Sequence, residues 1–165
     1  PAPPARDGRV TGMPIDILGV TDAAISHTMA TGRFERVNGH EPKNPPSTGG
    51  LTGAVWTDRI IPIASRSGRD SVTASVVLNV RVYASAVSEP ADAIDPGMVA
   101  AVDDVVRAFI GDFTLGGLVS NIDIFGAHGQ ALDVRAGYLT QDGMPYRVLT
   151  IWLPVIVNDL WTEAP

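Results

Sequence analysis

The stretch from 71 to 84, SVTASVVLNVRVYA, alternates its side chains with a period of two almost without a break. The even positions are all apolar: Val72, Ala74, Val76, Leu78, Val80, Val82 and Ala84. This pattern is typical of a β-strand with one face in the core and the other face more polar. Such a strand would be about 45 Å long, which exceeds the diameter of about 40 Å expected for a compact domain of this size. We therefore expect it to bend at a bulge or to project from the body.

A second long strand is predicted near the C-terminus, where the segment 146–161 reads YRVLTIWLPVIVNDLW. Pro154 lies in the middle of this segment. Proline has no N–H to donate to a neighbouring strand, so it belongs at a sheet edge or at a bulge. An apolar edge strand invites aggregation unless something covers it. We therefore expect Pro154 to mark an edge at a subunit contact, with a second copy of the chain as the cover.

The remaining pattern predicts helices and short strands around these two segments. A helix is expected from Pro14 to Gly32 and a second helix from Asp95 to Gly111, with Asp95 as its N-cap. Short strands are expected at 34–37 and 51–64, and three further strands start at Leu118, Ala131 and Met144, joined by the turns AHGQ and DG. The buried helix stripes are predicted to be Ile15, Leu18, Ile25 and Met29, and Val99, Val102, Val106, Phe109 and Ile110.

These elements predict an α+β fold in which two helices pack on one face of a mostly antiparallel β-sheet. We expect a flexible N-terminal arm at 1–13 and one domain over 14–165. The chain contains no cysteine, which excludes disulfides, thiolate metal sites and cysteine nucleophiles. We see no secretory signal, and the apolar run 148–157 is too short for a membrane-spanning helix.

Charge is distributed unevenly along this acidic chain of net charge −6. The segment 59–69 holds three arginines and no acid, whereas the segment 89–104 holds five acids and no base. We expect these two segments to meet between neighbouring subunits; the alternative is a solvated surface on which charge has segregated. The residues concerned are Arg59, Arg66 and Arg69 on one side, and Glu89, Asp92, Asp95, Asp103 and Asp104 on the other.

Catalytic and cofactor-binding motifs were not found in the sequence. The three histidines, His27, His40 and His128, have no metal-ligand spacing, and no nucleophile elbow or phosphate-binding glycine loop is present. The tryptophans do not alternate with basic residues, so we expect them to pack in the core or at an interface. We therefore expect no cofactor, no metal and no enzymatic activity.

Several phrases of the sequence, in the same order, resemble one known family. They are GHEPKNPP, GLTGAVWTDRIIPIASRSG, VVLNVRVYASAVSEPADAIDPGMVAAVDDVVRAFIGDFTLGG and IDIFGAHGQALDVRAGYLTQDGMPYRVLTIWLPVIVNDLW. Together they resemble the tail terminator proteins of long-tailed phages, in the branch common in phages of actinobacteria. The resemblance runs over nearly the whole chain from about residue 14. The arm before that residue matches nothing in the family.

The resemblance implies a structural virion protein with no catalytic residues. It implies a ring of six subunits that caps the completed tail tube, ends its elongation and joins the tail to the head-side connector. The implied partners are further copies of the chain, the major tail tube protein and the head–tail connector protein, and genomic DNA would pass through the bore without specific binding. The implied location is the tail or neck of the virion, and the host cytoplasm during assembly.

Two other functions are compatible with the sequence. One is another structural protein of the neck or tail tube, and the other is a small hydrolase. If the chain forms a ring, its acidic balance predicts a bore lined by acidic or neutral side chains, with any arginines there paired to carboxylates. The loops at 38–50 and 65–70, rich in Gly, Pro, Ser and Asn, are predicted to become ordered on assembly.

Overall fold

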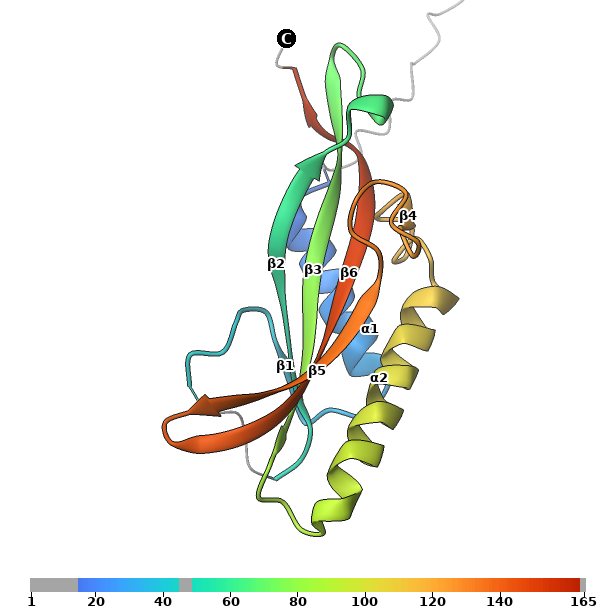
Figure 1. Cartoon of the computed structure of the whole chain (residues 1–165). Helices are drawn as coiled ribbons and strands as arrows, with labels where there is room; N and C mark the ends of the chain where they lie inside the picture. Colours follow the sequence, from blue (N-terminus) through green and yellow to red (C-terminus); the bar gives the residue numbers. More distant parts are fainter. Residues whose placement is uncertain (1–14, 45–48, 164–165) are drawn as a thin grey trace, which may run out of the picture.

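The computed structural model describes residues 15–44 and 49–163 as a long, twisted β-sheet with two helices on one face (Figure 1). The order along the chain is α1 (Ile17–Ala30), β1 (Arg36–Asn38), β2 (Thr52–Pro62), η1 (Ala64–Arg66), β3 (Ser71–Ser85), η2 (Ala91–Ala93), α2 (Ile94–Gly111), β4 (Asn121–Ile122), β5 (Asp133–Gln141) and β6 (Met144–Thr162). The predicted α+β class is confirmed. The predicted arm, Pro14 and the loop residues 45–48 lie outside the described residues.

The sheet is built around the two long strands that the sequence predicted. Its order is β1-β2-β3-β6, and both β4 and β5 pair with the far edge of β6. Only the β1–β2 pair is parallel among the described strands. The expected irregularities occur as register shifts between Thr57 and Arg59 in β2 and between Val72 and Ala74 in β3. The sheet is thus mostly antiparallel, as predicted.

Both faces of β3 are buried, which corrects the prediction of a half-buried strand. The even side chains, such as Val76 and Leu78, face the main core beneath the helices. On the opposite face Ser75 and Val77 are also almost fully buried. The loop after β4 lies against this region, since Arg59 of β2 donates a 2.7 Å hydrogen bond to Gln130. The cover comes from a segment more than forty residues away, which the local alternation does not encode.

Helix α1 begins one turn later than predicted and presents a different face to the core. Asp16 caps it by accepting a hydrogen bond from the Gly19 N–H. The buried positions include Val20, Ala24 and Thr28, whereas Leu18 and Met29 of the predicted stripe are exposed. Small side chains let the helix lie close to the sheet, and the Thr28 hydroxyl is satisfied by the Ala24 carbonyl at 2.8 Å.

Helix α2 is confirmed, but its buried stripe is rotated from the predicted one. Its core-facing residues are Met98, Ala101, Val102, Val105 and Phe109, and they pack with α1 and the sheet in one cluster. Val99 and Ile110, predicted to be buried, are 58% and 46% exposed. Asp95 is not the N-cap, because the helix starts after Ala93 and Asp95 lies in its first turn. No described helix is long and apolar enough to cross a membrane.

Pro154 does not lie in an edge strand, so that prediction is wrong. Strand β6 has β3 on one side and both β4 and β5 on the other, and Pro154 is buried opposite Val77. Its carbonyl accepts a 2.9 Å hydrogen bond from the Asp123 N–H, but it has no N–H to return. The Asp123 carbonyl instead accepts from the Gly126 N–H at 3.3 Å. Pro154 therefore ends the pairing of β4 with β6, and the segment after β4 turns away from β6 into a loop.

The C-terminal third contains one hairpin rather than two. The strand predicted from Leu118 shortens to the two residues of β4, and β4 and β5 do not pair with each other but share the edge of β6. AHGQ is thus not a hairpin turn. The DG turn is confirmed: Asp142 and Gly143 have φ of 49° and 76°, the left-handed conformation that a tight β5–β6 hairpin requires.

Candidate subunit interface

The three predicted interface arginines are exposed and lie in β2, in η1 and in the turn between η1 and β3. Arg59 of β2 contacts Gln130 and lies 3.9 Å from the Asp58 carboxylate. Arg66 of η1 donates to Asn158 at 3.1 Å and to Ser120 at 3.4 Å. Arg69 is exposed and contacts no carboxylate among the described residues. Two of the three are therefore already held by polar side chains of their own chain, but Arg66 has no acidic partner there.

Three of the five predicted acids are paired within the chain. Asp95 accepts from Arg147 at 2.9 Å, Asp103 from Arg107 at 2.5 Å, and Asp104 from Arg33 at 2.6 Å. Because each of these three acids already pairs with an arginine of its own chain, the prediction that they pair with a neighbouring subunit is weakened. Glu89 and Asp92 are exposed and have no basic partner in the described part of the chain. These two acids are the carboxylates of this segment without an ion-pair partner in the described part of the chain.

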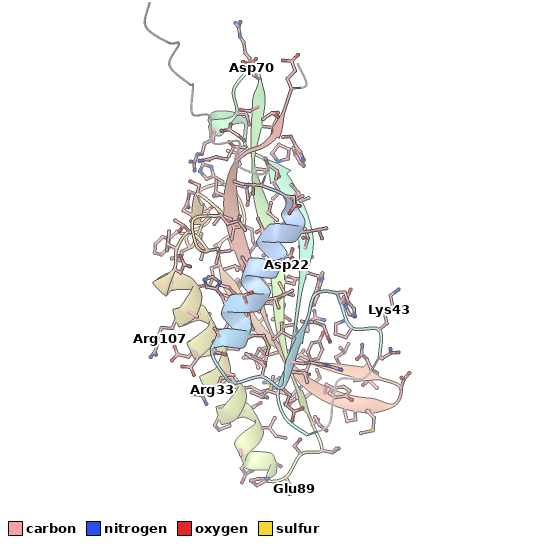
Figure 2. The ribbon with its side chains drawn as sticks, turned by 180° about the vertical axis from the view of Figure 1, so that it is seen from behind. Asp22, Arg33, Lys43, Asp70, Glu89 and Arg107 are labelled. Atoms are coloured by element: carbon pink, nitrogen blue, oxygen red, sulfur yellow. The ribbon has the colours of Figure 1, made fainter. Side chains whose placement is uncertain are left out.

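The basic and acidic segments lie at opposite ends of the molecule. Figure 2 places Asp70, next to Arg69 in the sequence, at one tip and Glu89 at the other. Arg69 therefore cannot pair with Glu89 or Asp92 of the same chain. Asp70 and Glu163, however, also lie beside Arg69. The two segments are suited to a head-to-tail contact, in which one surface meets a different surface of the next subunit.

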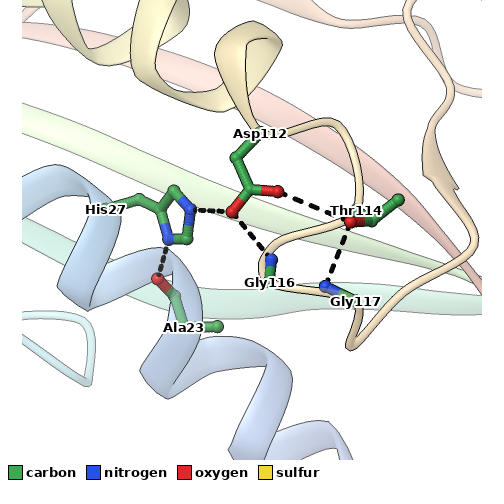
Figure 3. A network of polar contacts seen from close by, with 6 residues as sticks. All are labelled: Ala23, His27, Asp112, Thr114, Gly116 and Gly117. Carbon is green, nitrogen blue, oxygen red and sulfur yellow. Dashed lines mark hydrogen bonds and ion pairs between the residues drawn. The ribbon is translucent and has the colours of Figure 1, made fainter.

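A polar network joins α1 to the end of α2 (Figure 3). His27 contacts the Ala23 carbonyl through Nδ1 at 2.8 Å and the Asp112 carboxylate through Nε2 at 2.8 Å. Both partners only accept hydrogen bonds, and which ring nitrogen donates depends on the tautomer of His27. His27 also stacks on the Phe109 ring, with centroids 6.1 Å apart. The sequence interpretation of His27 as a local hydrogen-bonding residue is confirmed.

Asp112 connects this network to the turn after α2. The hydrogen bond from His27 holds the pKa of the Asp112 carboxyl below its usual value, and the Gly116 N–H, which donates at 2.7 Å, acts in the same direction. Thr114 in turn accepts from the Gly117 N–H at 3.0 Å. The network thus holds the loop that leads from α2 to β4. Its partners are all structural, and we assign it no catalytic role.

The loop after β4 holds a phenylalanine in solvent. Phe125 is 93% exposed, although the loop around it is closely hydrogen-bonded. The buried Asp123 carboxylate accepts from the Ala127 and His128 N–H groups, each at 2.9 Å. The Leu132 N–H closes the loop by donating to the Ile124 carbonyl at 3.0 Å. The loop therefore presents an aromatic ring on a rigid support.

Sequence reasoning did not single out Phe125, because IDIF was interpreted as part of the strand that starts at Leu118. The signal that was available is the aspartate followed by Gly126 and Gly129 in DIFGAHG. Aspartate side chains often accept hydrogen bonds from nearby backbone N–H groups in turns, and here the donors lie four and five residues further on. Gly126 has φ of 71°, and a Cβ there would lie 2.8 Å from the Ala131 nitrogen. Only glycine fits this position without a shift of the backbone.

The sheet face opposite the helices carries arginines stacked on aromatic rings, a feature that the sequence analysis also missed. Arg81 lies 5.0 Å from the Trp56 ring, and Arg135 lies 4.4 Å from the Trp152 ring. Each arginine also has a carboxylate nearby: Glu41 is 3.9 Å from Arg81, and Asp133 is 2.8 Å from Arg135. Trp56 and Trp152 are half-buried, as the predicted packing role requires, whereas Trp161 is 45% exposed in the described chain.

Residues that could hold a metal ion do not cluster anywhere in the described ranges, since no group of three His, Asp or Glu side chains converges there. Neither a scan against protein-family models nor a search of curated proteins found a match for this chain.

Proposed function

We propose that this chain is the tail terminator subunit of a long-tailed phage. In this proposal, six copies form a ring that caps the completed tail tube, ends its elongation and joins it to the head-side connector. The carrying observation is the collinear resemblance, which extends from about residue 14 to the end of β6. The fold class predicted from the order of elements in the sequence, a mostly antiparallel sheet with two helices on one face, agrees with the architecture in Figure 1.

The surface chemistry supports head-to-tail association, which gives a closed ring when the rotation between subunits closes. The basic segment 59–69 and the acidic residues Glu89 and Asp92 lie at opposite ends, as a head-to-tail contact requires. Exposed ion pairs contribute only about 0.2–1 kcal/mol each. They therefore set the register and the rate of association more than the stability of the ring, which apolar burial must supply.

The electrostatics also suit a channel through which DNA moves. The net charge of −6 disfavours binding to phosphates. Arg81, Arg135 and Arg147 each lie within 4 Å of a carboxylate and stack on aromatic rings. Arginines neutralised in this way attract duplex DNA weakly, wherever the ring places them.

The test is tube elongation in the presence of the chain. The tube protein encoded by the same phage is polymerised with and without this protein, and tube lengths and ends are recorded by electron microscopy. The proposal predicts capped ends, shorter tubes and particles of six subunits. If the protein instead adds along the tube as open stacks, it is a tube or connector component. If it neither binds tubes nor self-associates, and a substrate screen gives turnover, it is an enzyme and the proposal fails.

A further inference from the structure

The exposed ring of Phe125 is the feature of this molecule least explained by the fold itself. A surface phenylalanine is ordinarily tolerated as a scattered residue. Here, however, a buried carboxylate and two glycines with positive φ, Gly126 and Gly129, are used to build the loop that holds it. Aromatic anchors held rigid before binding are typical of interaction hot spots, because little conformational entropy is lost when they dock.

A pocket of matching character lies at the other end of the molecule. It has a volume of about 250 Å³ and lies between the segment 49–51 and the start of α2. Its apolar lining is Leu51, Ala84, Pro90, Ala93 and Ile94. An apolar cavity of roughly 150 Å³ is enough to bind benzene, so this pocket is large enough for a phenylalanine ring.

The charges around the two features are complementary. Arg59 donates to Gln130 of the same loop as Phe125, and Arg66 donates to Ser120 just before β4. Glu89 lines the pocket, and Asp92 lies in the adjacent η2. Two arginines are thus hydrogen-bonded to the segments before and after Phe125, although Arg59 also lies 3.9 Å from the Asp58 carboxylate. The pocket is flanked by carboxylates that have no basic partner in the described chain.

We propose that Phe125 of one copy inserts into the pocket beside Glu89 of a second copy. The ring and the pocket cannot meet within one chain, because β4 lies in the upper half of Figure 1 while Figure 2 places Glu89 at the opposite end. The contact is therefore head-to-tail, with an apolar centre and a rim of opposite charges. This inference rests on the proposed function in one respect only, the closure of the head-to-tail contact into a ring.

Two single variants test the two halves of the contact. Phe125→Ala removes the ring from an exposed position, so the fold is unaffected. Gly97→Leu fills the pocket from its rim, where a Cβ meets no atom within 4 Å. Each variant is expected to raise the concentration needed for self-association by about 30-fold or more, as the loss of a buried aromatic anchor does. Leu18→Ala is the matched control. It shortens a different exposed apolar side chain, on α1 and 74% exposed, and should leave association unchanged.

Mixing the two variants gives the sharpest readout. Phe125→Ala retains an intact pocket and Gly97→Leu retains an intact ring, so an equimolar mixture is expected to form dimers by sedimentation while neither variant does so alone. Absence of these dimers, or association by both variants at wild-type concentrations, overturns the inference. A wild type that stays monomeric both alone and with the tube protein also overturns it.

The same experiment separates this inference from the proposed function. Rings of six subunits that survive both substitutions leave the proposed function intact and refute the role of Phe125. Open chains that require both Phe125 and the pocket support the contact but refute the terminator ring.

Discussion

The loop that carries Phe125 depends on one buried carboxylate, and removing it has a calculable effect. Asp123 is 5% exposed and accepts two backbone hydrogen bonds, from Ala127 and His128, each at 2.9 Å. Replacement by alanine leaves two N–H groups without an acceptor in a partly buried site. Hydrogen bonds to charged groups contribute about 1.5–3 kcal/mol each, but rearrangement of a surface loop recovers part of that loss. We expect Asp123→Ala to lower the free energy of unfolding by about 2–4 kcal/mol.

Asp123→Asn refines the same prediction. The asparagine side chain keeps the size of the carboxylate but can accept from only one of the two N–H groups, because its amide nitrogen is a donor. We expect it to lose about half as much stability as the alanine variant. Asp22→Ala is the control, since Asp22 is an exposed acid on the outer side of α1 (Figure 2), and substitutions of this kind usually change stability by less than about 0.5 kcal/mol.

Urea unfolding, followed by tryptophan fluorescence and by circular dichroism, measures these differences. Phe125 should also become more accessible to protease cleavage in Asp123→Ala, because the loop loses its internal support. An Asp123→Ala variant within 0.5 kcal/mol of the wild type, like the control, would refute the reasoning that the carboxylate holds the loop.

Four further predictions follow from particular contacts. Phe109→Ala, at a fully buried core position beneath α1, should lower the free energy of unfolding by about 3–5 kcal/mol in a urea titration, and a loss below 1 kcal/mol would contradict the described core. Gly126→Ala should destabilise the loop by about 1–3 kcal/mol, because the new Cβ would lie 2.8 Å from the Ala131 nitrogen. Gly143→Asn in the hairpin turn is the control and should be nearly neutral, because asparagine tolerates positive φ and a Cβ there meets nothing within 4 Å. Because the pKa of Asp112 is lowered in the folded state, its ionised carboxyl stabilises the fold above the ordinary carboxyl pKa of 3.8, and this stabilisation is lost as the pH falls through the folded-state pKa. Asp112→Asn should therefore be less stable than the wild type at pH 7, and the difference should shrink below pH 3.8. A difference that does not change with pH would rule out this linkage. Arg69→Glu, at an exposed arginine without a carboxylate partner, should slow self-association more at low salt than at high salt, as measured by light scattering, and equal rates at both salt concentrations would remove this residue from the contact.

The long strands were predictable because their signal is local. The alternation in 71–84 depends only on the period of a strand, and β3 occupies Ser71–Ser85. What covers each face was not predictable in the same way. The loop after β4 and the β5–β6 hairpin cover the second face of the sheet from distant parts of the chain, and no pattern within β3 reports their presence.

The helix stripes were misjudged for a related physical reason. Counting large apolar side chains favoured Leu18 and Met29 in α1, but the face against the sheet contains Ala24 and Thr28. Close approach of a helix to a sheet favours small side chains, while large ones can remain exposed on the outer face. In α2 the difference is one of rotation, since its buried face includes the large side chains of Met98 and Phe109 while Val99 lies outside it.

Pro154 shows how a correct local inference can lead to a wrong global one. Proline does interrupt a ladder here, as expected, but the interruption is used within the chain. It lies between the pairing of β6 with β5, which ends at Trp152, and its pairing with β4, which begins at Val155. Two short strands share one edge of β6, and a single sequence does not reveal that arrangement.

The position of charged residues in the candidate interface was predictable from the sequence, but the exposed Phe125 at its proposed centre was not. Segregation of charge is visible in the sequence, and the two segments do lie at opposite ends. The pairing of Asp95, Asp103 and Asp104 with arginines of the same chain depends on tertiary contacts and was not predicted. Exposure of Phe125 likewise depends on where β4 ends, which Pro154 of a later strand decides.

The most direct test of the proposed terminator role is the mass of the particles that this protein forms with the tail tube of the same phage. Native mass spectrometry of the purified protein, and mass measurement along capped tubes by electron microscopy, should both give six copies in one ring at a tube end. A variable number of copies that grows with protein concentration, or copies distributed along the tube, would contradict the account.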